Sequence, residues 1–175
     1  MDYVRDHSMM VVFFGFFSMV WYGWAQENPP AEWRKYIGIA TAVSTLLLLL
    51  GIYLSIKNWD KATALANPSS MTNYFIFLIL EFLIAGIGVF LLFRMGLKEY
   101  AAPWVCFIVG VHFFGLKFVF DDFSLHILGL LLVIISISSL FVAKKYGVAN
   151  SLVTGVTAGT TLNLFVLYNL FRLFF

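Results

Sequence analysis

The stretch MTNYFIFLILEFLIAGIGVFLLF (residues 71–93), the short turn RMGLKE (94–99) and the stretch YAAPWVCFIVGVHFFGLKFVF (100–120) together decide the fold of this chain. Each apolar run has about the 20 residues that an α-helix needs to cross ~30 Å of hydrocarbon. Because the turn between them is short, the second helix must return beside the first in the opposite direction. The sequence therefore predicts two neighbouring, antiparallel transmembrane helices.

Four further apolar runs of similar length flank this pair, separated by polar segments that contain prolines or clustered charges. In lipid every backbone polar group must be satisfied inside a helix or a closed barrel, and long unbroken apolar runs favour helices. We therefore predict an all-α integral membrane six-helix bundle, a single transmembrane domain over residues 1–175. The expected spans are about 8–25, 36–56, 71–93, 100–120, 125–143 and 150–172.

The composition excludes several classes of function. Of the 175 residues, 62% are hydrophobic and 11% are charged, and the mean hydropathy is +0.93. The net charge of +2 comes from scattered residues, so we expect no nucleic acid as a partner. Cys106 is the only cysteine, which excludes an internal disulfide and a cysteine-based zinc site. No spacing of His and carboxylates predicts a metal, and no motif predicts a cofactor.

The distribution of basic residues gives a weak orientation. Loops one, three and five carry six Lys or Arg, against three on the other side, which favours both termini outside. Counting Lys117 and Arg172 at span ends narrows the ratio to six to five. The first run, preceded by Arg5 and followed by Gly23-Trp24-Ala25, also has the outline of a signal peptide, but we expect it to be retained as a span.

Two ionisable residues lie in the middle of the paired spans 71–93 and 100–120. Glu81 lies twelve residues before the end of one span and His112 lies twelve residues after the start of the next. Across an antiparallel hairpin both are at the same depth, roughly 18 Å from the shared turn and close to the bilayer midplane. Ala85 and Gly88 share the helical face of Glu81, and Gly115 shares that of His112. Small residues mark faces where helices pack closely in lipid. We therefore expect Glu81 and His112 to touch inside the bundle.

Such a pair has two interpretations. Ionisable groups at mid-membrane cost roughly 2.5 to 3.5 kcal/mol on insertion scales, so each is a functional candidate, and a coupled Glu81–His112 pair could exchange protons near neutral pH. The alternative is a neutral pair that hydrogen-bonds across the two helices and contributes about 0.6 to 2 kcal/mol to packing. We prefer the first interpretation and keep the second.

The last span carries Ser151, Gly155 and Gly159 at four-residue spacing, continued by Asn163. This pattern predicts a small-residue packing stripe, with a polar lining for a transport pathway as the alternative. We include Asn163 with Glu81 and His112 as a candidate substrate or proton site. Near the same end of the bundle we expect Asn169 and Arg172 to form an interfacial anchor.

Charged residues also mark the end of the fourth span. Lys117 and Asp121 are an i,i+4 pair, for which we prefer a snorkelling Lys117 in a weak salt bridge. The alternative makes Lys117, Asp121 and Asp122 the mouth of a cavity, where charges would steer ions. Ser124 is the expected N-cap of the fifth span.

The stretch around Glu81, then Pro103-Trp104 and Val109-Gly110-Val111-His112-Phe113, resembles an uncharacterised family of small bacterial membrane proteins. That family carries a buried Glu followed by a Pro...Val-Gly-x-His-Phe span. The resemblance covers about a third of the chain, and Phe114 to Lys117 replace a Pro-Leu-Ala-like continuation. It implies a bacterial origin and draws attention to Glu81 and His112, but it implies no activity.

From these observations we expect a small bacterial transporter or channel-like protein of the inner membrane, proton-linked through Glu81 and His112. Its partners would be the lipid bilayer and a small ion or small-molecule substrate, and the small-residue faces are compatible with a homo-oligomer. One alternative is a non-catalytic bundle that binds a partner protein or lipid. Another is an intramembrane lipid-modifying enzyme, although no nucleophile motif supports an enzyme.

Overall fold

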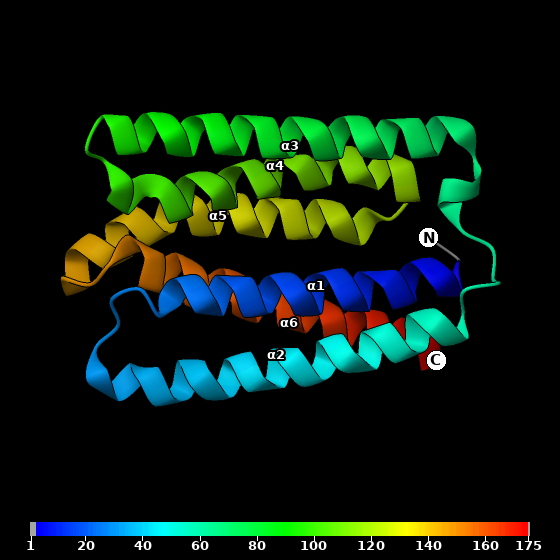
Figure 1. Cartoon of the computed structure of the whole chain (residues 1–175), viewed down its shortest axis with the longest axis horizontal. Coiled ribbons are helices and arrows are strands. Elements are labelled where there is room, and N and C mark those ends of the chain that lie inside the picture. The colour runs from blue at the N-terminus through cyan, green and yellow to red at the C-terminus, as the bar shows by residue number, and fades with distance from the viewer. Residues whose placement is uncertain (1–2, 175) are drawn as a thin grey trace.

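A computed structural model describes residues 3–174 of the chain, and within this range it contains six long α-helices (Figure 1). All six are long and apolar enough to cross a membrane, which confirms the all-α six-helix bundle and a multi-pass membrane protein. Two short 3-10 turns, η1 (Ala64–Ala66) and η2 (Lys98–Tyr100), precede α3 and α4. The helices are α1 (Val4–Ala25), α2 (Ala31–Lys57), α3 (Pro68–Arg94), α4 (Ala101–Phe120), α5 (Phe123–Tyr146) and α6 (Asn150–Phe174).

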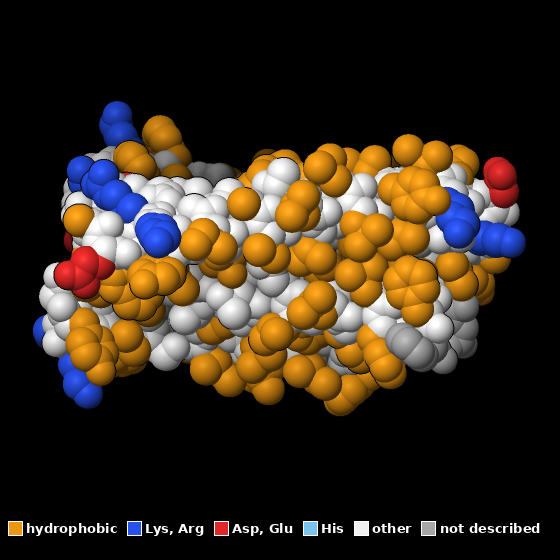
Figure 2. All heavy atoms as spheres, turned by 90° about the horizontal axis from the view of Figure 1, so that it is seen from below, with side chains coloured by type: hydrophobic (Ala, Val, Ile, Leu, Met, Phe, Trp, Pro, Cys, Tyr) orange, Lys and Arg blue, Asp and Glu red, His pale blue; other side chains and the backbone are white. Residues whose placement is uncertain are grey.

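The surface has the charge distribution of a membrane protein. On the face shown in Figure 2, basic and acidic side chains gather at the two ends of the molecule, and hydrophobic side chains cover the band between them. Large apolar side chains such as Leu46, Phe82 and Phe141 are well exposed, as lipid-facing residues are. Both described ends of the chain lie at the same end of the bundle (Figure 1), as an even number of spans requires.

Four helices build the core and two flank it. The main cluster of buried apolar side chains comes from α1, α4, α5 and α6, with Phe14, Phe113, Leu128 and Leu162 among them. α2 packs chiefly on α1, and α3 packs chiefly on α4, so these two helices lie at opposite edges of the bundle (Figure 1). α3 is described in full, and none of its residues is buried.

The small-residue stripe of the last span is a packing surface, as predicted. A Cβ added to Gly155 would lie 2.5 Å from the Trp21 carbonyl oxygen, and one added to Gly159 would lie 3.0 Å from the ring of Tyr22. The Ser18 hydroxyl donates to the Gly159 carbonyl at 3.1 Å. Because Gly155 and Gly159 have no side chains, α1 can approach α6 closely.

The helices extend further into the polar flanks than the apolar runs predicted. α1 begins at Val4 rather than near residue 8, and α2 begins at Ala31 rather than near residue 36. The predicted N-cap of α5 was wrong: Asp122 is the cap, and its Oδ1 accepts from the Ser124 N–H at 2.9 Å. Hydropathy measures the length of chain in hydrocarbon, whereas helical hydrogen bonding continues into the headgroup layers.

Candidate functional site

The structure brings Glu81 and His112 together. His112 Nδ1 lies 3.4 Å from Glu81 Oε2, and the His112 and Glu81 side chains are 7% and 15% exposed. The predicted contact between the two spans is therefore present. Glu81 is the central residue of α3, thirteen positions from each end of Pro68–Arg94, so it lies about 20 Å along the helix axis from either end.

A second contact shows which nitrogen of the His112 imidazole carries a proton. His112 Nδ1 is also 3.2 Å from the carbonyl oxygen of Phe77, one turn before Glu81. Because a carbonyl only accepts, this hydrogen bond requires a proton on Nδ1. That N–H points at the carbonyl and also faces the Glu81 carboxyl at the longer distance. Both acceptors of this N–H therefore belong to α3.

The helix face that carries Glu81 is shaped to receive α4. Trp104 Nε1 donates to the Ala85 carbonyl at 3.3 Å, and its indole covers Gly88, where an added Cβ would lie 2.0 Å from Nε1. One turn beyond His112, Gly115 leaves room for the ring of Phe77. The small residues predicted to mark the contact face therefore do so on both helices.

Asn163 belongs to a different part of the bundle, so its grouping with Glu81 and His112 is not reproduced. Its Nδ2 donates to Ser44 Oγ at 2.9 Å, and Ser44 lies in α2. α2 and α3 are the opposite edges of the bundle (Figure 1). Asn163 therefore joins α6 to α2 by a hydrogen bond, which fits the packing role that we preferred for its stripe.

The three residues of the predicted cavity mouth have separate roles. Lys117 Nζ is 3.8 Å from Asp121 Oδ1, and the Asp121 side chain is 94% exposed, which fits the preferred weak salt bridge. Asp121 ends α4 with a left-handed φ of 48°. Asp122 is buried, caps α5 and lines the groove described below.

Sequence reasoning missed a buried polar cluster at the start of α1. Asp6 is 3% exposed, and its carboxylate accepts from Thr63 Oγ1 at 2.5 Å and from the Ala64 N–H at 2.8 Å. Ser8 accepts from Asn58 Nδ2 at 3.0 Å. These bonds tie the connection between α2 and α3 to α1. The only sequence signal was the Asp-His-Ser triplet just before the first apolar run.

His7 completes this cluster and corrects a prediction. Its Nδ1 lies 2.8 Å from Asn169 Oδ1, and both side chains are 3% exposed. Asn169 is therefore a buried partner of α1 and not an interfacial anchor with Arg172. Arg172 instead donates to the Tyr168 hydroxyl at 2.9 Å. Within the described residues, no group of three metal-ligating side chains comes together.

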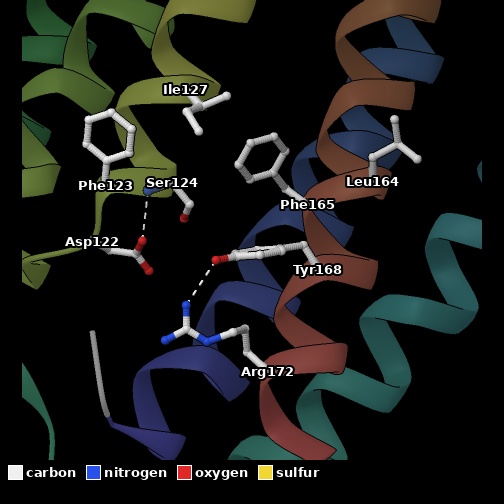
Figure 3. A pocket seen from close by; sticks show the side chains of 8 residues that line it. All are labelled: Asp122, Phe123, Ser124, Ile127, Leu164, Phe165, Tyr168 and Arg172. Carbon is white, nitrogen blue, oxygen red and sulfur yellow. Dashed lines mark hydrogen bonds between the residues drawn. The ribbon is translucent and has the colours of Figure 1, made fainter. Parts of the chain in front are cut away.

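Two hollows lie at the ends of the bundle, and Glu81 lines neither of them. One of about 430 Å³ lies between α5 and α6 (Figure 3). The other, of about 310 Å³, is lined by loop residues such as Glu27, Lys98 and Asn150 at the opposite end. Glu81 and His112 lie at the contact between α3 and α4 and line neither hollow.

Comparison with protein-family models, with curated proteins and with solved structures found no match to this chain. The class defined by fold and site is thus a six-helix membrane protein with an intramembrane carboxyl–imidazole contact. The resemblance to a bacterial membrane family stays a prediction.

Proposed function

We propose that this protein is a small proton-linked transporter or channel-like protein in which Glu81 and His112 form the proton-binding site. The observation that carries the proposal is the contact of 3.4 Å between a carboxyl and an imidazole group at the centre of a membrane span. Placing two ionisable side chains at this depth is costly, and such residues commonly lie on ion or proton pathways. We further propose, from the family resemblance, a bacterial inner membrane location.

The position of the pair supports a moving part. α3 contributes no buried residue and is attached chiefly through α4, so it can shift without opening the main core. The hydrogen bonds of Trp104 and His112 to backbone carbonyls of α3 both lie in the interface between α3 and α4. A change in the protonation of Glu81 or His112 alters the attraction between α3 and α4 and can thereby move α3.

The cargo in this proposal is a proton or a small ion. A bulky solute needs a hollow at its binding site, whereas Glu81 and His112 lie in a close contact between α3 and α4 and line neither of the hollows described above. Proton transfer needs only titratable groups within reach of transient water. The competing interpretation is that the pair is a packing contact in a bundle that binds a partner protein or lipid, and it predicts no proton movement.

The test uses purified protein in vesicles that enclose a pH-sensitive dye. With an imposed pH gradient and a counter-ion path, the native protein should acidify the lumen faster than protein-free vesicles do. Glu81→Gln should reduce this rate at least tenfold. Glu99→Gln, which removes an exposed carboxyl from the α3–α4 turn, is the matched control and should leave the rate unchanged.

Infrared spectroscopy supplies a second readout of the same site. A carboxyl band that changes with pH in the native protein should be missing in Glu81→Gln. Native and Glu81→Gln vesicles that acidify at the same rate would remove Glu81 from the mechanism. A rate equal to that of empty vesicles for the native protein would favour the packing interpretation.

A further inference from the structure

A groove of about 430 Å³ lies between the start of α5 and the end of α6, away from Glu81 and His112. It is at the end of the bundle where the described chain begins and ends (Figure 1). Since both helices reach the membrane boundary there, the groove lies at the depth of lipid headgroups and the first acyl carbons. Six of its lining residues matter here: Asp122, Phe123, Ile127, Leu164, Tyr168 and Arg172.

The wall of the groove is apolar and open to lipid. Phe123, Ile127 and Leu164 are 70%, 46% and 60% exposed, and they stand on the two helices that border the groove. In a spanning helix such side chains face hydrocarbon. An acyl chain that lies along this wall is therefore continuous with the bilayer around it.

The polar end of the groove carries both signs of charge. Figure 3 shows the Asp122 carboxylate, the Tyr168 hydroxyl and the Arg172 guanidinium pointing toward one another from α5 and α6. Arg172 Nη1 donates to the Tyr168 hydroxyl at 2.9 Å. Asp122 uses Oδ1 to cap α5, and its second oxygen points toward the space between Tyr168 and Arg172 (Figure 3).

We propose that this groove binds one glycerophospholipid whose headgroup carries a primary ammonium, as phosphatidylethanolamine does. Arg172, with the Tyr168 hydroxyl, holds the phosphate, because a guanidinium matches phosphate geometry and forms strong charge-assisted hydrogen bonds. The Asp122 carboxylate accepts from the ammonium. One acyl chain lies along Phe123, Ile127 and Leu164. The site is independent of the proposed proton pathway.

The acidic residue selects among lipids. Phosphatidylglycerol has the same phosphate but offers no cation to Asp122, so the charge of the carboxylate stays uncompensated. Phosphatidylcholine has the cation, but its methylated nitrogen cannot donate a hydrogen bond to the carboxylate. The order of affinity should therefore be phosphatidylethanolamine first, with the other two lipids at least several-fold weaker.

Native mass spectrometry of the full chain, delipidated and titrated with each of the three lipids, measures this order directly. Arg172→Gln should weaken phosphatidylethanolamine binding about tenfold, because it removes the charge that holds the phosphate. Asp122→Asn should abolish the preference over phosphatidylcholine while the helix stays capped, since Asn is as good an N-cap as Asp. Arg94→Gln, at the end of α3 on the opposite side of the membrane, is the matched control and should bind as the native protein does.

Filling the groove tests the acyl part of the site. Ile127→Trp should weaken binding of long-chain phosphatidylethanolamine but leave the oligomeric state and the helical content unchanged. Equal affinity of native protein and Arg172→Gln for phosphatidylethanolamine would overturn the proposal. So would equal affinity of the native protein for all three lipids, which would indicate general lipid adhesion, or no lipid bound because a second copy covers the groove.

Discussion

Two carboxyl–imidazole regions of this molecule differ in how fully their hydrogen bonds are satisfied. At the start of α1, Asp6 accepts two hydrogen bonds of 2.5 and 2.8 Å, and the neighbouring His7 pairs with Asn169 at 2.8 Å. At the centre of α3, Glu81 meets His112 at 3.4 Å. The first region is closed by short bonds to two different segments, the α2–α3 connection and α6. In the second region, the two contacts of His112, to Glu81 at 3.4 Å and to the Phe77 carbonyl at 3.2 Å, are longer and both reach α3.

The difference separates an anchor from a candidate working site. A buried polar network with every member satisfied rigidifies a fold and is costly to disturb. A partly satisfied pair at mid-membrane is a poor anchor but can gain and lose protons. The same residue types thus favour a structural role in α1 and a functional role in α3. Four predictions test this contrast, ordered from the largest expected effect to the smallest.

Asp6→Ala should have the largest effect on stability. The substitution leaves the Thr63 hydroxyl and the Ala64 N–H without their buried acceptor, which should lower the free energy of unfolding by about 3 kcal/mol. Glu81→Ala should cost only about 1 kcal/mol, the usual value for an interhelical polar contact in membranes. Unfolding in mixed micelles measures both. A larger loss for Glu81→Ala would reverse the assignment of anchor and site.

Gly155→Ala should separate α1 from α6. The new methyl group would lie 2.5 Å from the backbone oxygen of Trp21, and we expect a loss of about 2 kcal/mol. Gly88→Ala meets the Trp104 side chain instead and should cost about half as much, because α3 can move outward into lipid. Gly23→Ala, with no atom within 4 Å of its Cβ, is the control and should be neutral or slightly stabilising. Equal losses at Gly155 and Gly23 would contradict the close packing.

His112→Ala should loosen α3 without loosening α1. Because α3 is attached chiefly through α4, loss of the imidazole contacts should let it open more often and raise the deuterium exchange of its amides relative to those of α1 by about three- to tenfold. Hydrogen exchange with mass spectrometry of peptides from both helices measures this. Unchanged exchange in residues 68–94 would show that the pair does not hold α3.

Lys117→Gln should have the smallest effect. Its partner Asp121 is almost fully exposed, and the distance between Lys117 Nζ and Asp121 Oδ1 is 3.8 Å. Exposed ion pairs of this kind contribute about 0 to 0.5 kcal/mol to stability. The free energy of unfolding of Lys117→Gln in mixed micelles should therefore equal that of the native protein within the error of the measurement. A loss above about 1 kcal/mol would indicate that Lys117 has a role beyond this pair.

The parts of the site that could be predicted from sequence depended on one-dimensional rules. The rise per residue and the short turn placed Glu81 and His112 at one depth, and the small residues Ala85, Gly88 and Gly115 indicated their faces. Asn163 and Asn169 were misplaced because each lies on a long helix with several polar neighbours. Periodicity gives a direction on the helix, but it does not say which helix lies in that direction.

The sequence by itself determined the membrane environment, the six helices and the antiparallel α3–α4 pair, because these follow from the length of apolar runs and from local connections. Only the tertiary structure decided that α3 is an edge helix, that Asp6 and His7 are buried partners of residues 57 and 162 positions away, and that α5 and α6 border a groove. Hydropathy does not distinguish a helix face that contacts lipid from one that packs on another helix. The neighbours of each face are set by side-chain packing among segments far apart in the chain.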